Sequence, residues 1–305
     1  MKHYEVYLIG HITFDELRDD ADGRHSFFYG GAELFSAYAA RAAGGRVGLL
    51  TKLSAQHRPV LDLLPFDNGD ICCLESPQTT SMLNWYASAD RERRELIVSS
   101  VAEPFSMADL PPGVESEIYH LAGLMRGDFA ENMVEKLAAR GKVAADMQGF
   151  LRCRHPETKK LYFQDYPRKL QMLPHIAFLK TDAAEAEILT GFTDRAQAAR
   201  QMCAWGAGEV MVTHGSEAIV CKNGRLWRCP LTPKTLEGRT GRGDTIFGAY
   251  IAERLKHGVY ASLQFAAAAA SLKMEQPGPL KKTRKQICQY KNDAYEKATK
   301  KEGWI

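Results

Sequence analysis

The sequence predicts an α/β fold: a mostly parallel sheet with helices on both faces and a small β-lid. Three observations support this prediction. Near the start of the chain, short apolar runs typical of buried strands alternate with amphipathic helical segments, and the same alternation returns after residue 118. Two stretches, at about 12–29 and 70–100, interrupt it with turn residues and the alternating pattern of antiparallel strands. We therefore expect one domain, 1–305, with a lid formed by these two insertions.

The composition is that of a globular protein, with 305 residues, 45% of them hydrophobic and 25% charged. A net charge of +3 is too small to indicate a nucleic-acid partner, and the basic segment 281–301 is interpreted as a solvated terminal helix. Seven scattered cysteines without a C-x-x-C pair predict neither a zinc site nor a disulfide framework. The chain starts directly with a strand, and no apolar run is long enough to span a membrane. We expect a cytoplasmic protein without a membrane partner.

The pattern of the first part of the chain, from Tyr4 to Thr51, predicts a βαβ unit with an inserted hairpin. Tyr4–Gly10 has the apolar run of a buried strand, and Asp22-Gly23 is a typical hairpin turn. Gly30-Gly31 then opens a helix over Ala32–Ala43, and Val47–Thr51 is the next strand.

The second insertion is richer in aromatic and β-prone residues. Thr79–Ala87 alternates as a strand does, 90–94 is a charged turn, and Glu95–Ser100 resumes a strand. With the hairpin at 12–29 this segment would form the lid. Asn84 and Arg94 are candidates to point inward, although an arginine in a charged turn is more typical of a solvated hairpin tip.

From residue 118 the strands and helices follow one another again. The expected strands are Ile118–Ala122, Lys142–Asp146, Ile176–Leu179, Glu209–Thr213, Ala218–Cys221 and Leu226–Cys229, and the expected helices are Asp128–Arg140, a segment ending at Leu189, one beginning at Gly243, and Tyr260–Lys273. Asp146 and Gln148 follow the end of one strand, where ligands gather in open α/β sheets. Asp182 and Glu185 have the spacing of a capping box at the start of a helix.

The most informative stretch is the glycine-rich loop that opens the helix at Gly243. Glycines let main-chain N–H groups converge, and a helix N-terminus adds partial positive charge, so 241–243 predicts an anion site. Asp244 sits in the first turn of this helix, where a carboxylate would repel a phosphate. Its presence fits a general base that takes a proton from a hydroxyl attacking that phosphate. The alternative is a carboxylate that only complements the helix dipole.

This segment resembles the second signature of the ribokinase-like (PfkB) carbohydrate kinases. The resemblance rests on Gly241, Gly243 and Asp244, with Thr240 and Phe247 beside them. Two positions depart from the family pattern: Gly238 stands where the family usually has Asp, and Arg242 stands where Ala is usual. In potassium-activated relatives that Asp helps to bind the monovalent cation, so the resemblance implies little activation by K⁺ here.

The resemblance covers nearly the whole chain and implies a kinase that uses ATP and Mg²⁺ to phosphorylate a hydroxyl of a sugar or sugar-like polyol. Asp244 would be the base, and Gly241, Arg242 and Gly243 the anion hole. The residues expected at the acceptor are Asp15, Gly30, Gly31, Asn84 and Arg94. Those expected at the nucleotide are Lys180, Asp182, Thr213, Gly215 and Gly278. Glu185 would organise the metal ion through its water shell, and the lid would close over the acceptor and exclude water.

Two other functions remain open at this point. One is a nucleoside or inositol kinase on the same fold, because Trp85 and Tyr86 could stack on a base. The other is a ligand-binding regulatory protein without catalysis, which Gly238 and Arg242 favour and an intact Asp244 opposes. The sequence contains no Walker A motif, which excludes the P-loop kinases. ADP as the donor and a homodimer formed through the lid are further expectations that the sequence leaves open.

Overall fold

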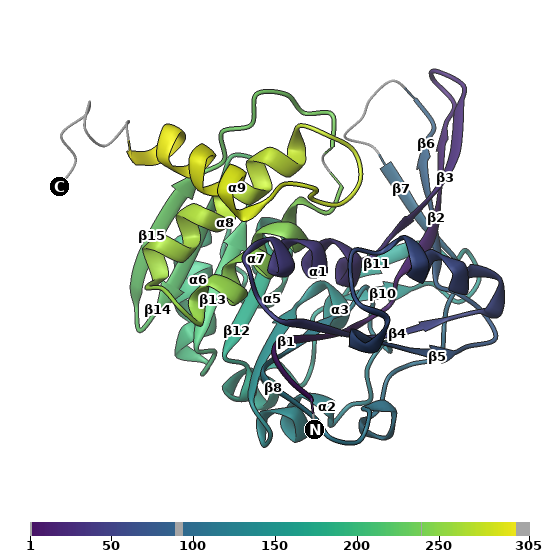
Figure 1. Cartoon of the computed structure of the whole chain (residues 1–305), viewed down its shortest axis with the longest axis horizontal. Coiled ribbons are helices and arrows are strands. Elements are labelled where there is room, and N and C mark those ends of the chain that lie inside the picture. Colours follow the sequence, from purple (N-terminus) through teal and green to yellow (C-terminus); the bar gives the residue numbers. More distant parts are fainter. Residues whose placement is uncertain (1, 89–93, 239, 297–305) are drawn as a thin grey trace.

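The architecture is a large sheet with helices on both faces and a second, smaller sheet beside it (Figure 1). The structure, a computed structural model, describes residues 2–88, 94–238 and 240–296. Within these residues nine strands form the main sheet, in the order β15-β14-β13-β12-β9-β8-β1-β4-β5. The α/β class and the mostly parallel sheet are thereby confirmed.

Seven strands of the main sheet are parallel, and a hairpin at one edge adds two antiparallel strands. The parallel strands are β1 (Lys2–Gly10), β4 (Val47–Leu53), β5 (Ile71–Glu75), β8 (Val114–Ala122), β9 (Lys142–Asp146), β12 (Phe178–Asp182) and β13 (Glu209–Thr213); the hairpin strands are β14 (Glu217–Lys222) and β15 (Arg225–Pro230). Strands covered on both faces carry continuous apolar runs, which is why their positions were readable from the sequence.

The helices fall into two layers. On one face lie α1 (Ala32–Ala42), α7 (Arg242–Arg254) and α8 (Val259–Met274), with α9 (Arg284–Lys291) packed against α8. On the other face lie α2 (Met133–Ala138), α5 (Ala183–Thr190) and α6 (Arg195–Ala204), with the short α3 (Gln148–Leu151) and α4 (Lys169–Met172) nearby. Single turns and short irregular helices occur at Ala55–Leu63, Asn68–Asp70, Met107–Asp109, Leu173–His175 and Asn292–Glu296. No helix in the described part of the chain has the length and apolarity needed to cross a membrane.

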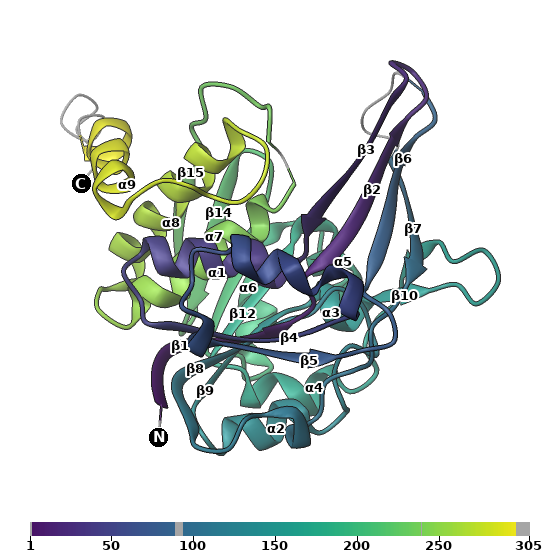
Figure 2. The same cartoon turned by 45° about the vertical axis from the view of Figure 1, so that its right-hand side comes forward.

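The lid is a four-stranded sheet in the order β3-β2-β6-β7, which projects away from the main sheet (Figure 2). Its strands are β2 (Thr13–Asp19), β3 (Arg24–Gly30), β6 (Ser81–Tyr86) and β7 (Arg94–Ser100). The two insertions join through a parallel pairing of β2 with β6, so the lid is only partly antiparallel. A short hairpin, β10 (Arg152–Arg154) with β11 (Leu161–Phe163), contacts β7.

Two expected boundaries are wrong. The second insertion begins after residue 75, because Ile71–Glu75 pair with β4 as the edge strand of the main sheet. The helix expected over Asp128–Arg140 is shorter, Met133–Ala138. Asp128 instead closes a turn: its Oδ2 accepts hydrogen bonds from the main-chain N–H groups of Leu124 and Met125 at 2.7 and 3.2 Å. The charged turn expected at 90–94 lies outside the described residues, apart from the start of β7.

Candidate active site

A cavity of about 560 Å³ lies between the lid and the carboxyl ends of the main-sheet strands. It is lined from both sides, by β2 and β6 of the lid and by β12, β13 and the start of α7. Ten of the residues expected at the site line it: Asp15, Gly31, Asn84, Lys180, Asp182, Thr213, Gly241, Arg242, Gly243 and Asp244. The sheet register explains part of this gathering, because Lys180 pairs with Asp146 and Asp182 pairs with Thr213 where neighbouring strands end.

The glycine loop forms an anion site at the start of α7. Gly241 is the residue before the helix and has φ +78°, the left-handed region that favours glycine. A Cβ at this position would also collide with the ring of Phe35. A Cβ on Gly243 would lie 3.0 Å from Lys180 Nζ, so the absence of a side chain lets the lysine ammonium approach the helix N-terminus. Main-chain donors and a fixed cation therefore converge on one point of the cavity.

Asp244 occupies the first turn of α7 and faces the same cavity. It is partly buried, and its main-chain oxygen accepts a hydrogen bond from Ser36 Oγ at 3.0 Å. This bond ties the start of α7 to α1, whose first residue follows Gly31 on the acceptor side of the cavity. The backbone around the carboxylate is thus held, and the carboxylate is available to a hydroxyl placed between the lid and the anion site.

Lys180 is held among carboxylates. Its Nζ donates a 2.6 Å hydrogen bond to Asp146 Oδ2, and both side chains are buried. Burial favours the neutral lysine, but Asp146, Asp244 and Glu185 outweigh it and raise the Lys180 pKa. Burial also raises the pKa of Asp146, to about 7, against the opposing effect of Lys180. The ammonium therefore remains charged at neutral pH, as a phosphate ligand should.

Asp182 and Glu185 form the expected capping box at the start of α5. Asp182 Oδ1 accepts from Glu185 N at 2.8 Å, and Asp182 N donates to Glu185 Oε2 at 2.9 Å. Glu185 is fully buried behind the cavity wall, and burial raises its pKa. Its second oxygen, Oε1, lacks a hydrogen-bond partner among the described residues and lies 3.5 Å from Arg152 Nη2.

The donor set suits a hydrated magnesium ion. Asp182 and Asp244 present hard oxygen atoms to the cavity, and Mg²⁺ usually takes one or two carboxylates and keeps several waters. A direct cage of three or more such ligands is not found among the described residues. Glu185 does not line the cavity, so the role expected for it, through the water shell of the ion, stays a prediction.

Glu185→Gln tests that role. Glutamine serves in a capping box, and α9 of this chain already uses Gln286 at the same position, so the helix should remain capped. We expect kcat to fall and the Mg²⁺ requirement to rise while Tm stays unchanged. Turnover measured over a range of Mg²⁺ concentrations, with Tm from the same preparation, checks this. An unchanged Mg²⁺ dependence would leave the capping box as the whole role of Glu185.

The acceptor side is built at the base of the lid. Asp15 is 8% exposed; its Oδ1 accepts from Met82 N at 3.0 Å and its Oδ2 from Thr13 Oγ1 at 2.9 Å. Asn84 lies on the next strand, with Nδ2 3.4 Å from the main-chain oxygen of Glu16. Gly30 lies behind this wall: a Cβ there would be 3.1 Å from Asp15 Oδ2. The lid thus presents a carboxylate and an amide, groups that bind hydroxyls, opposite Asp244.

Other expected residues lie away from the cavity wall. Gly215 lies in the exposed turn after β13, where a Cβ would be 3.8 Å from Arg242 Nη1, and Gly278 lies in an exposed turn after α8. Arg94 begins β7 opposite Tyr86, and its side chain is outside the described parts. Trp85 points to the other face of the lid, where Nε1 donates to Asp20 Oδ2 at 2.8 Å, while Tyr86 lines the cavity.

Asp146 and Gln148 were expected near a ligand because they lie at a strand's carboxyl end, but neither they nor Arg152 were given a role at the site. Gln148 and Arg152 line the cavity, and Asp146 anchors Lys180. Asp146 is the last residue of β9, and Gln148 and Arg152 follow it, so their place at a strand's carboxyl end was the available signal. Phe35, which packs on Gly241, had no comparable signal.

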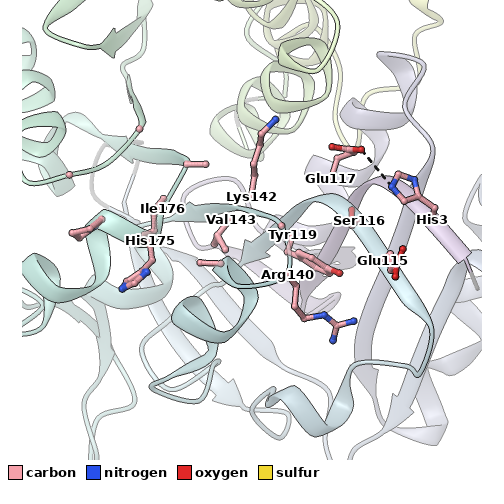
Figure 3. Close-up of a pocket in the computed structure, with 16 residues that line it drawn as sticks. His3, Glu115, Ser116, Glu117, Tyr119, Arg140, Lys142, Val143, His175 and Ile176 are labelled. Atoms are coloured by element: carbon pink, nitrogen blue, oxygen red, sulfur yellow. Dashed lines mark ion pairs between the residues drawn. The ribbon is translucent and has the colours of Figure 1, made fainter.

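A larger hollow of about 990 Å³ lies at the opposite edge of the sheet (Figure 3). It is lined by strand beginnings and preceding turns, including His3, Glu117 and His175. His3 and Glu117 form an exposed ion pair there, 3.6 Å apart. None of the described residues that line this hollow belongs to a glycine-rich helix N-terminus, whereas the smaller cavity has one next to Asp244 and Lys180. The smaller cavity is therefore the candidate active site.

Comparison with known proteins agrees with this geometry. The family model for the pfkB family of carbohydrate kinases matches residues 5–285. The chain belongs to this family. It is therefore a kinase, a phosphotransferase that acts on hydroxyl groups, and the resemblance inferred from the glycine loop is confirmed.

Three similar proteins illustrate the range of the pfkB family. A pyrophosphate-dependent kinase of the ribokinase family, solved with a pyrophosphate analog and myo-inositol, is 33% identical with a TM-score of 0.82; the match covers 92% of this chain and 98% of that one. The cytidine kinase of Thermococcus kodakarensis is 23% identical over 257 residues, 81% of this chain and 87% of its own. The Arabidopsis thaliana ribokinase, solved with ribose and ATP, is 17% identical with a TM-score of 0.73, covering 95% of this chain and 99% of that one.

Proposed function

We propose that this kinase phosphorylates a hydroxyl of a sugar-like cyclic polyol of the inositol class. The observation that carries the proposal is one cavity with Asp15 and Asn84 at one wall and Asp244, Lys180 and the anion loop at the other. Hydrogen-bonding groups at the lid suit an acceptor with many hydroxyls. The 33% identical kinase solved with myo-inositol supports this acceptor class over ribose or a nucleoside.

We assign each of these residues a part in the proposed transfer. Asp15 and Asn84 orient the polyol so that one hydroxyl faces Asp244, which takes its proton as the hydroxyl oxygen bonds to the terminal phosphorus of the donor. The bond from that phosphorus to the bridging oxygen breaks, and the rest of the donor leaves as ADP from ATP or as phosphate from pyrophosphate. The main-chain N–H groups of 241–243 and the Lys180 ammonium stabilise the charge on the transferred group. The lid excludes water, which would otherwise accept the phosphoryl group. Mg²⁺, when bound, neutralises charge on the donor phosphates.

The donor we propose first is ATP with Mg²⁺, as the resemblance to the family implied and as the ribokinase solved with ATP supports. Pyrophosphate is the second candidate, and two observations favour it. The 33% identical relative is pyrophosphate-dependent. In addition, none of the described residues that line the cavity comes from 214–238 or from beyond Asp244, and Gly278, expected beneath adenine, lies outside it. The described lining thus holds the expected anion site but neither Gly215 nor Gly278, two of the residues expected at the nucleotide.

A matrix of donors and acceptors tests the proposal. ATP, ADP and pyrophosphate would each be combined with myo-inositol, ribose, fructose and cytidine, with phosphorylated product detected by mass spectrometry. We expect the highest kcat/KM with myo-inositol for any active donor. A preference for cytidine or ribose of more than about tenfold, or 1.4 kcal/mol, would overturn the acceptor class. If kcat/KM with pyrophosphate exceeded that with ATP by more than about tenfold, pyrophosphate would be the donor in place of ATP.

We further propose that the enzyme forms a homodimer through its lid and works in the cytoplasm. The edge strand β3 carries Phe27, which is 56% exposed and stacks on Phe14. The seven cysteines, all within the described residues, are free thiols, which suits a reducing compartment. Sedimentation velocity of the wild type and of Phe27→Ser tests the dimer; a monomeric wild type would exclude it.

A further inference from the structure

A buried lysine lies behind the anion loop, outside the cavity. Lys273 is in the last turn of α8 and only 1% exposed. Its Nζ donates a 2.7 Å hydrogen bond to the main-chain oxygen of Gly238 and lies 5.3 Å from the centre of the Phe35 ring. The ammonium therefore contacts Gly238, at the start of the loop that leads into the anion site.

Keeping a charge at this position is costly. Burying an ammonium removes its hydration, and this burial lowers the Lys273 pKa to about 8, with Asp244 acting in the opposite direction. The surrounding segment of α8 is rich in alanine and mostly apolar, so an apolar side chain would fit the packing without that cost. The charge itself is therefore the feature that needs an explanation.

The loop beside Lys273 is fixed at both ends. At its start, Gly238 N donates a hydrogen bond to the main-chain oxygen of Met274 at 2.8 Å. A Cβ on Gly238 would collide with the main-chain oxygen of Gln276, so no carboxylate fits there. At its other end, Gly241 packs on Phe35, the ring beside the Lys273 ammonium. The lysine and this ring together support Gly238 and Gly241, the residues at the two ends of this loop.

We propose that Lys273 is a built-in monovalent cation that positions the anion loop. Its ammonium holds the Gly238 carbonyl, and with it the loop, so that the N–H groups of 241–243 face the donor phosphates. Its charge also partly offsets the carboxylate of Asp244 close to those phosphates. Lys273 is thus a positioning residue of the proposed transfer. Because the chain supplies this cation, the wild type should not need K⁺.

The test compares Lys273→Ala, Lys273→Met and the wild type in Na⁺, K⁺ and NH₄⁺ at fixed ionic strength. Wild-type turnover should differ less than about twofold among the salts. The alanine variant, which leaves space for an ion, should lose about tenfold to a hundredfold in kcat, the range of one charged hydrogen bond, and regain much of it in NH₄⁺ or K⁺. The methionine variant fills the space without charge, so it should lose the same activity and show no rescue.

Donor binding separates this proposal from the proposed function. Calorimetry with ATP and with pyrophosphate needs no turnover, and the methionine variant should bind the active donor about tenfold more weakly while Tm is unchanged or higher. If the methionine variant matches the wild type in binding and turnover, or if the wild type rises tenfold in K⁺, Lys273 is not the cation. If the alanine variant fails to fold, the methionine variant and Lys273→Arg test the proposal instead. Arginine keeps the charge, so Lys273→Arg should retain donor binding while the methionine variant loses it.

Discussion

Asp244→Asn is expected to lower kcat at least about a hundredfold while the fold and donor binding remain. A positioned general base typically contributes about 10²–10⁴-fold, or roughly 3–5 kcal/mol of barrier. Asparagine has nearly the same shape and is tolerated in a first helical turn, but it cannot take a full proton from the attacking hydroxyl. Donor affinity should be unchanged or tighter, because a negative charge beside the phosphates has been removed. Steady-state turnover and calorimetry on the same preparation measure both.

Asp194→Asn is a matched control for this substitution. Asp194 also begins a helix, α6, where its Oδ1 accepts a hydrogen bond from Gln197 N at 2.7 Å, and it does not line the cavity. The same chemical change there should leave kcat unaltered. If Asp244→Asn lost less than about tenfold in kcat with donor binding intact, Asp244 would be a complement to the helix dipole rather than the base.

The anion loop was predictable because its chemistry is local. Three glycines before an amphipathic segment determine a helix N-terminus, and α7 begins at Arg242, one residue before the expected start. Asp182 and Glu185 are a similar case, since a capping box spans only four residues and the structure contains it. In both places neighbouring residues supply all the interactions that define the feature.

Features that depend on pairing across the chain were not predictable in this way. The parallel pairing of β2 with β6 places Glu16 opposite Leu83, and the strands that separate them give no sign of it. The edge strand at 71–75 looked like part of the lid because its partner, β4, cannot be read from a five-residue segment. Lys273 in an alanine-rich helix had only one signal, a lone charge between Leu272 and Met274.

Lys180→Met is the second substitution with a large expected effect. It removes the cation that lies beside Gly243 at the anion site, and removal of one preorganised donor of this kind typically costs about 10²–10³ in kcat. We expect a loss in that range, with weaker donor binding as well. Methionine fills most of the volume of the lysine side chain, so a collapse of the cavity wall is not the cause.

The same variant should lose stability, because Asp146 would remain buried without its 2.6 Å partner. Breaking a buried ion pair on one side costs about 3–5 kcal/mol when the remaining charge persists. The sign of the pH dependence follows from the pKa of Asp146, which burial raises to about 7 and which the loss of Lys180 would raise further. The folded carboxyl then keeps a proton that the unfolded chain has released, so stability should fall as pH rises from 5 to 9. Urea unfolding at several pH values measures this.

The double variant Lys180→Met/Asp146→Asn separates the two roles of Lys180. With no ionisable group left in the pair, the steep loss of stability at high pH should disappear, because no buried carboxylate remains to be neutralised. Catalysis should stay low, since the anion site still lacks its cation. If the double variant instead regained wild-type turnover, Lys180 would act only as the partner of Asp146. The phosphate would then be held by the main-chain N–H groups of 241–243 and by Arg242, the charged side chain at the start of α7.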